Sequence, residues 1–144
     1  MEADIYEYFY CDLGRVAAAC ANQSGELFDI SDLIDSVRAP IEQAQIRFIR
    51  NFNLEVIGYY TWARLTPSVS KNYISNPSYA LHVSEWNEGD EIWIIDLRSQ
   101  KGFLKIIYAD ICSAFGAAHT QVNWRSRNNY NHVRLDIKPA GSAQ

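Results

Sequence analysis

The chain has 144 residues, a formal net charge of −4, 48% hydrophobic residues and 21% charged residues. These values predict one globular domain over residues 1–144 with a buried core. No apolar run approaches the roughly 18 residues of a membrane span, and no secretory signal is visible, so we expect a cytoplasmic protein. Residues 1–45 hold nine acids and two arginines, which argues against a nucleic-acid partner, whereas residues 101–144 hold six bases that suit an acidic partner.

The cysteines and histidines do not have the spacing of a metal site. The three cysteines form no C-x-x-C pair, which suits a reducing cytosol, and each is expected to be a small core residue. The histidines are spaced too irregularly to join them as zinc ligands, so no zinc site is predicted. The residues concerned are Cys11, Cys20, Cys112, His82, His119 and His132.

The first half of the chain predicts two helices and a hairpin. Apolar residues recur near a period of 3.6 over residues 4–21, which indicates a helix. Ser31 is a plausible N-cap for a second helix that ends before Pro40. Two strands over 45–50 and 54–62 follow, joined by Asn-Phe-Asn, the residue types of a tight turn.

The second half centres on one apolar strand. Thr66 and Pro67 predict the start of a short helix. An Asn-Glu-Gly-Asp turn then leads into Ile-Trp-Ile-Ile, and a strand with apolar residues on both faces belongs inside a covered sheet. That strand is placed at 86–96. A helix at 103–116 and strands at 121–127 and 131–137 complete an α/β (α+β) fold, a twisted mixed sheet of about five strands covered by helices.

Asp96 is expected at the far end of the central strand. An ionised carboxylate that leaves a dry strand must find partners or take part in chemistry. The alternative is that Asp96 only caps a loop.

The order of elements is similar to that of N-acetyltransferase-like (GNAT) folds. The chain more specifically resembles the toxin-activating lysine acyltransferase family, which modifies internal lysines of RTX protoxins. The resemblance covers roughly residues 12–138 and is clearest over 54–104. Its blocks are Tyr60-Thr61-Trp62-Ala63, Glu85-Trp86, Gly89-Asp90 and Trp93-x-Ile95-Asp96, with weaker support from Leu13-Gly14 and Pro40-Ile41.

The resemblance implies two catalytic residues, an early histidine and an aspartate after the central strand. Asp96 matches the aspartate. The position of the histidine falls on Glu26, which is a departure from the family. Either Glu26 replaces the histidine as general base, or the chain keeps the fold without catalysis. His82 is a further candidate if the fold brings it near Asp96, although an ordinary surface or core role is the alternative.

The resemblance also implies an acyl thioester on acyl carrier protein as donor and a lysine amine of a protein or peptide as acceptor. A free lysine amine has a pKa near 10.4, so only about one in 2,000 is neutral at pH 7. A base within hydrogen-bond reach removes that obstacle and contributes roughly 10²–10⁴ in rate. We therefore expect Glu26 to take the amine proton and Asp96 to orient the amine, with no bound cofactor.

Aromatic and basic residues are candidates for binding the donor. Trp62 and Trp93 are expected to shape an apolar groove for the acyl chain, with core packing as the alternative. Arg125 and Arg127 are candidates to dock an acidic carrier, with an ordinary solvated role as the alternative. No G-x-G-x-x-G/A loop is visible, which favours acyl carrier protein over acyl-coenzyme A.

Three functions remain open at this point. The first is a lysine acyltransferase that uses acyl carrier protein. The second is a silent family member that acts as a binding scaffold, and the third is a GNAT-like enzyme that acylates a small amine from acyl-coenzyme A. Apolar strands at the sheet edge also make a homodimer reasonable.

Overall fold

The structure is a computed structural model that describes residues 2–21, 29–116, 121–126 and 132–137. The predicted order α-α-β-β-α-β-α-β-β is confirmed, with one added 3₁₀ helix, η1. The elements are α1 (Glu2–Ala21), α2 (Ile30–Glu42), β1 (Ile46–Arg50), β2 (Val56–Leu65), α3 (Pro67–Ser75), η1 (Val83–Glu85), β3 (Glu91–Ser99), α4 (Leu104–Phe115), β4 (Gln121–Arg125) and β5 (His132–Asp136).

The strands form one five-stranded sheet in the order β1-β2-β3-β4-β5. The pairs β1–β2 and β4–β5 are antiparallel, whereas β3 and β4 are parallel, so the predicted mixed sheet is confirmed. The chain divides into two compact units, and both β2 and β3 contribute residues to each of them. The prediction of a single domain over residues 1–144 stays a prediction.

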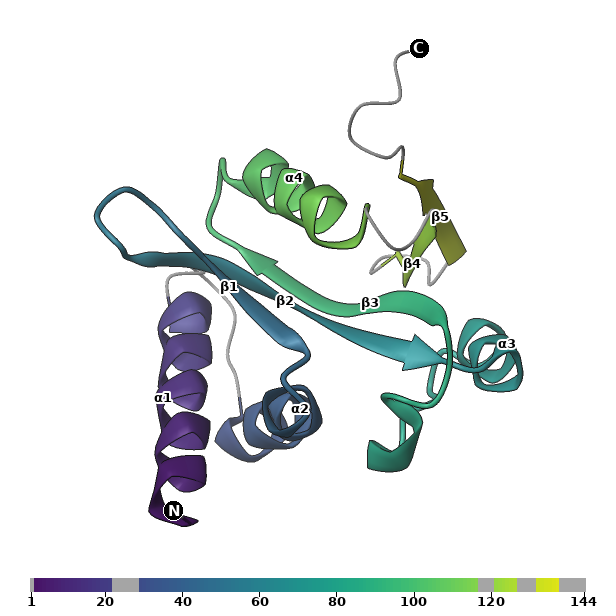
Figure 1. The fold of residues 1–144 in the computed structure, drawn as a ribbon, viewed down its shortest axis with the longest axis horizontal. Coiled ribbons are helices and arrows are strands. Elements are labelled where there is room, and N and C mark those ends of the chain that lie inside the picture. Colours follow the sequence, from purple (N-terminus) through teal and green to yellow (C-terminus); the bar gives the residue numbers. More distant parts are fainter. Residues whose placement is uncertain (1, 22–28, 117–120, 127–131, 138–144) are drawn as a thin grey trace. The chain divides into compact units, whose positions relative to one another are not determined.

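Unit 1 comprises residues 1–61 and 96–107. Figure 1 shows its helices α1 and α2 beside the β1–β2 hairpin. Apolar residues spaced three and four apart on α1 and α2 bury one stripe of each helix against β2. The buried residues of this core are Val16, Ala19, Cys20, Val37, Ile41 and Tyr59.

Unit 2 comprises residues 62–95 and 108–144, and Trp93 of β3 lies at its centre. Trp93 is 1% exposed, and its ring meets Tyr73 of α3 edge-on and stacks on His132 of β5. Its indole Nε1 donates to Ser70 Oγ over 3.1 Å, so the polar edge of a buried ring is satisfied. A second aromatic pair joins Trp62 of β2 to Phe115 of α4.

Two predicted details of α2 are wrong. The N-cap is Asp29, whose carboxylate accepts from the Ser31 backbone N–H over 2.8 Å, so the helix starts at Ile30 and not after Ser31. The helix also continues through Pro40 to Glu42. Because Pro40 lies in the last turn and is buried, the missing N–H removes only one helical hydrogen bond near the end.

The bounds of the central strand also differ from the prediction. The predicted strand begins at Trp86, whereas β3 begins at Glu91. The N–H groups of Glu88 and Gly89 instead both donate to the carbonyl of Arg64 on β2. At its other end β3 runs three residues past Asp96, to Ser99. The Gln100 N–H still donates to the Ile57 carbonyl over 2.8 Å, so pairing with β2 extends beyond the acid. Asp96 therefore lies inside β3, not at its end.

Candidate active site

The two carboxylate oxygens of Asp96 contact different groups, and all of these groups belong to unit 1. The Tyr59 hydroxyl donates to Oδ2 over 3.3 Å. The Leu97 backbone N–H donates to Oδ1 over 3.0 Å, and Arg98 Nε lies 3.5 Å from the same oxygen. The backbone N–H of Asp96 in turn donates to Thr61 Oγ1 over 3.1 Å. Asp96 is thus fixed by both its side chain and its main chain.

The partners of Asp96 are more buried than Asp96 itself. The Asp96 side chain is 29% exposed, whereas the Arg98 side chain is 14% exposed and Tyr59 and Thr61 are almost fully buried. A carboxylate that contacts a guanidinium and two hydrogen-bond donors has little freedom to rotate. Asp96 can therefore present an oriented acceptor to a molecule arriving at its exposed edge.

Tyr59 links this carboxylate to the helical side of unit 1. Burial, followed by the nearby Asp96 carboxylate, raises the pKa of the Tyr59 hydroxyl, so it remains a proton-bearing donor at neutral pH. Its oxygen also lies 3.9 Å from the Sγ atom of Cys20 on α1. Cys20 is buried in the core, as the sequence predicted, whereas the prediction is wrong for Cys11, which is exposed, and Cys112 is only half-buried.

The pairing of β3 with β4 involves residues that precede Asp96 in the chain. The parallel register pairs Trp93 with Asn123 and Ile94 with Trp124. Strand β4 ends one residue later, at Arg125, whereas β3 continues to Ser99.

The two other predicted catalytic residues are placed differently. Glu26 lies outside the described residues. His82 is exposed in unit 2, where its Nδ1 accepts from the Ser84 backbone N–H over 3.2 Å and lies 2.9 Å from Ser84 Oγ. This local role in capping η1 accounts for the imidazole's contacts. A catalytic role for Glu26 or His82 stays a prediction.

The four predicted donor-binding residues also occupy distinct environments. Trp93 is buried, and Trp62 is half-buried against Phe115, so aromatic packing accounts for both rings. The Arg125 Nη1 atom donates to the carbonyls of Tyr73, Asn76 and Pro77 over 3.0, 3.2 and 3.4 Å. Arg127 lies outside the described residues. The proposed contacts with an acyl chain or a carrier stay predictions.

The sequence analysis did not predict the structural role of Arg125. Its guanidinium lies 3.6 Å from the centre of the Tyr73 ring and caps the carbonyl end of α3, where a positive charge suits the helix dipole. The three carbonyls belong to the last turn of α3 and the two residues after it, more than 45 residues away from Arg125 in sequence. No signal in the sequence connects them to Arg125.

Comparison with known proteins identifies the family. The model of the RTX toxin acyltransferase family matches residues 11–138. The chain belongs to this family. The match includes Asp96 and both strands that carry its partners, so the family resemblance expected from the sequence is confirmed.

A curated relative of the same family is the RTX-II toxin-activating lysine-acyltransferase ApxIIC of Actinobacillus pleuropneumoniae. It is 30% identical over 104 residues, which cover 72% of this chain and 64% of that protein. The chain thus spans less than two-thirds of the length of this RTX toxin acyltransferase relative. Among solved structures, Naa20 of Chaetomium thermophilum in complex with a bisubstrate analogue has a TM-score of 0.44 and 16% identity, over 81% of this chain and 60% of that chain.

The structure of this RTX toxin acyltransferase family member also bears on membrane spanning and on metal binding. Among the described helices, no stretch combines the length and the apolar character that a lipid-spanning segment requires. Within the same described residues, no group of three or more His, Cys, Asp or Glu side chains is arranged to hold a metal ion.

Proposed function

We propose that this chain transfers a fatty acyl group from the thioester of acyl carrier protein to a lysine ε-amine of a protein. Membership of the RTX toxin acyltransferase family supports acyl transfer, and the name of its relative ApxIIC supports a lysine of a toxin as acceptor. The observation that carries the proposal is the fixed, partly exposed carboxylate of Asp96 between Tyr59 and Arg98.

The reaction needs a neutral amine beside the thioester. The lysine ammonium first gives one proton to a base, and the neutral amine then attacks the thioester carbonyl to form a tetrahedral oxyanion with a cationic nitrogen. Collapse of that intermediate breaks the carbon–sulfur bond, and the second proton of the nitrogen passes to the departing carrier thiolate, which leaves an amide on the lysine. In the proposal Glu26 accepts the proton from the amine.

Asp96 has the positioning role in this scheme. A lysine ammonium that enters the cluster meets a carboxylate whose other contacts are already fixed by Tyr59, Leu97 and Arg98. The bound amine is therefore oriented by one acceptor with little freedom to turn. Holding reacting groups in place is a large part of catalysis in two-substrate reactions.

The proposed carrier is acidic, and exposed lysines at the start of α4 suit it. Lys101 and Lys105 are both exposed in unit 1, on either side of the α4 start. Ion pairs at such sites are weak singly and are screened by salt. Binding of a carrier there would consequently fall as the ionic strength rises.

The direct test is a transfer assay with intact mass spectrometry. The purified chain is mixed with fatty acyl carrier protein and an RTX protoxin fragment that contains lysines. The expected result is a mass increase of one acyl group on a lysine. A parallel reaction with acyl-coenzyme A is expected to be slower.

Two outcomes would contradict the proposal. No mass increase with either donor, while carrier binding is detected, would indicate a scaffold. Transfer to a small amine from acyl-coenzyme A but not from acyl carrier protein would indicate a different acyltransferase. A Glu26→Gln variant that acylates at the full rate would remove Glu26 from the proposed scheme.

A further inference from the structure

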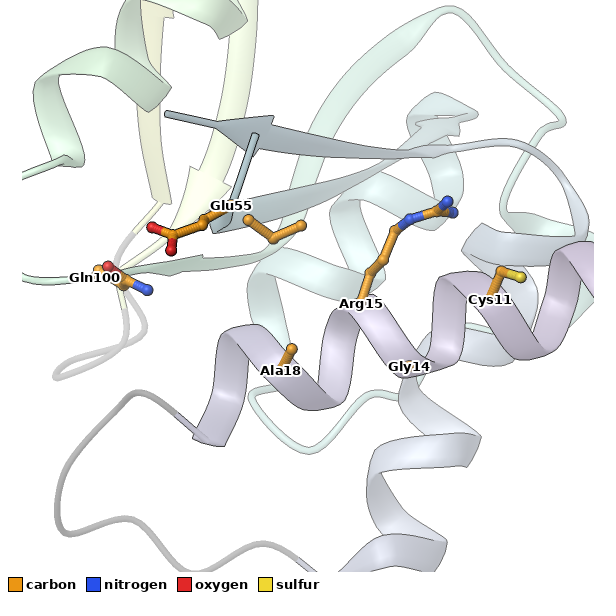
Figure 2. A pocket seen from close by; sticks show the side chains of 7 residues that line it. Cys11, Gly14, Arg15, Ala18, Glu55 and Gln100 are labelled. Atoms are coloured by element: carbon orange, nitrogen blue, oxygen red, sulfur yellow. The ribbon is translucent and has the colours of Figure 1, made fainter. Parts of the chain in front are cut away.

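A cleft of about 650 Å³ lies within unit 1 and is separate from the contacts of Asp96. Figure 2 shows its lining side chains, which come from α1, from the start of β2 and from the residue that follows β3. The lining residues are Cys11, Gly14, Arg15, Ala18, Glu55, Val56 and Gln100.

One face of α1 forms the floor of the cleft with small side chains. Cys11, Gly14 and Ala18 follow at intervals of three and four residues, so they share a helix face. A Cβ atom added to Gly14 would have no atom within 4 Å, so the space above this glycine is open. The helix backbone is thus approachable along about two turns.

The rim of the cleft carries a net negative charge at one end. Arg15 is already paired with Asp12 on its own helix. Glu55, by contrast, accepts from the amide of Asn51 over 2.8 Å, and that partner is neutral, so the Glu55 charge is not cancelled by it. A basic group near Glu55 would be attracted to this end of the cleft.

The polar rim suits a polypeptide better than an acyl chain. A hydrocarbon chain would cover Glu55 and Gln100 without offering hydrogen bonds, which is costly for polar groups. A peptide offers backbone N–H and C=O groups to the Gln100 amide and a basic side chain to the Glu55 carboxylate. The small residues of α1 leave room for a main chain to lie along the helix.

The strand that carries Asp96 leads to the cleft, because Gln100 of the cleft directly follows β3 and its N–H still pairs with β2. Side chains alternate along a strand, which puts positions 96 and 100 on one face. Four residues separate Asp96 from Gln100, and four separate Glu55 from Tyr59, the residue that contacts Asp96. Each separation is about 13 Å, the span of about four extended peptide residues.

We infer that this cleft binds the polypeptide that flanks the acceptor lysine and selects a basic side chain about four residues away from it. In this assignment Glu55 pairs with the basic side chain while the acceptor lysine lies at Asp96. The inference rests on the proposed function for the identity of the acceptor. The binding itself does not require transfer.

The test measures binding of labelled peptides by fluorescence anisotropy in the absence of donor. Two peptides carry one acceptor lysine each and differ only in an Arg or a Glu four positions from it. The wild-type chain is expected to bind the Arg peptide about tenfold more tightly, the effect of one well-placed charged contact. Glu55→Lys is expected to reverse this preference.

A pair of α1 variants tests the location. Gly14→Leu fills the open floor and is expected to weaken binding of the Arg peptide at least about tenfold. Ala17→Leu places the same leucine side chain at an exposed position of α1 that does not line the cleft, and it is expected to bind as the wild type does. Circular dichroism confirms that both variants remain helical.

Each result bears on one claim. Equal binding of the two peptides by the wild type, or unchanged binding by Gly14→Leu, would overturn the inference. A change in acyl-chain preference on Gly14→Leu without a change in peptide binding would assign the cleft to the donor instead. Selective peptide binding without any transfer would leave the cleft assignment intact and contradict the proposed function.

Discussion

The hydroxyl of Tyr59 donates a hydrogen bond to Asp96 Oδ2 across 3.3 Å, and so links β2 to β3 over 37 positions of sequence. Because burial raises the pKa of Tyr59, this hydroxyl keeps its proton over the physiological range and acts only as a donor to the carboxylate. The bond turns Asp96 toward the side of unit 1 that carries α1. The catalytic proposal and the peptide cleft both depend on that orientation.

Thr61 supports Asp96 from the main chain, and its removal should be measurable as lost stability. Thr61→Val keeps the shape but leaves the partly buried N–H of Asp96 without its acceptor, which costs about 1 kcal/mol of unfolding free energy. Urea unfolding followed by circular dichroism measures this loss. Thr61→Ser keeps the hydroxyl and is expected to lose less. Equal losses for Val and Ser would show that the hydrogen bond is not the cause.

Glycine is required at position 89 because the backbone of Leu65 passes close to it, and not because of the φ angle of Gly89. A Cβ at this position would overlap with the carbonyl of Leu65, while the Gly89 N–H donates to the Arg64 carbonyl over 3.0 Å. Gly89→Ala is therefore expected to lower the unfolding free energy by about 1–3 kcal/mol, the usual cost of overpacking.

Gly14→Ala is the matched control for this glycine. Position 14 lies in a helix with open space around it, so alanine should raise stability by about 0.5–1 kcal/mol. Opposite signs for the two substitutions in thermal unfolding would confirm the difference in backbone packing. A neutral Gly89→Ala would contradict it.

Substitutions of Arg125 can distinguish a structural role from a role in carrier docking. Arg125→Lys keeps the positive charge but loses the planar guanidinium that stacks on Tyr73 and reaches three carbonyls. If the residue is structural, unfolding free energy falls by about 1.5–3 kcal/mol, the range for hydrogen bonds to charged groups. If docking is its role, stability is retained and only Arg125→Gln raises the KM for the carrier.

The lowered pKa of His132 predicts that the stability of the protein depends on pH. Burial, followed by the nearby Arg134, lowers the pKa of His132, whose ring stacks on Trp93 while Nε2 lies 2.9 Å from Asn123 Oδ1. The unfolded chain then binds a proton at a higher pH than the folded chain does. Stability should therefore be full above about pH 6.5 and fall as the pH drops toward the lowered value.

The control for this dependence is His132→Gln, which cannot titrate. Urea midpoints of wild type and variant should converge as the pH falls below about 6.5 and separate above it. Parallel curves over pH 5–8 would exclude His132 as the titrating group.

Much of the fold was predictable because it depends on local patterns. Periodicity, the Thr66-Pro67 start of α3 and the two-sided apolar strand around Trp93 each act over a few residues. The errors arose where longer contacts decide the outcome. Pro40 is tolerated because it lies in a buried last turn, and β3 passes Asp96 because Gln100 still pairs with Ile57 of β2.

The candidate site was only partly predictable. Asp96 was identified from its place after an apolar strand and from the family motif. Tyr59 and Thr61 were missed as its partners, because they lie 37 and 35 positions away and only the β2–β3 pairing brings them together. Arg98 had a usable signal, since a residue two positions along a strand shares the face of Asp96.

The most direct test of the account compares Asp96→Asn with Asp90→Asn in the transfer assay with fatty acyl carrier protein and a protoxin fragment. Asparagine keeps the size of Asp96 but removes the charge that holds the amine, so the rate should fall by roughly 10²-fold, the cost of a misplaced reacting group, while the thermal midpoint changes little. Asp90 is exposed, and its variant should retain the wild-type rate. A full rate for Asp96→Asn would contradict the central claim that this fixed carboxylate positions the acceptor.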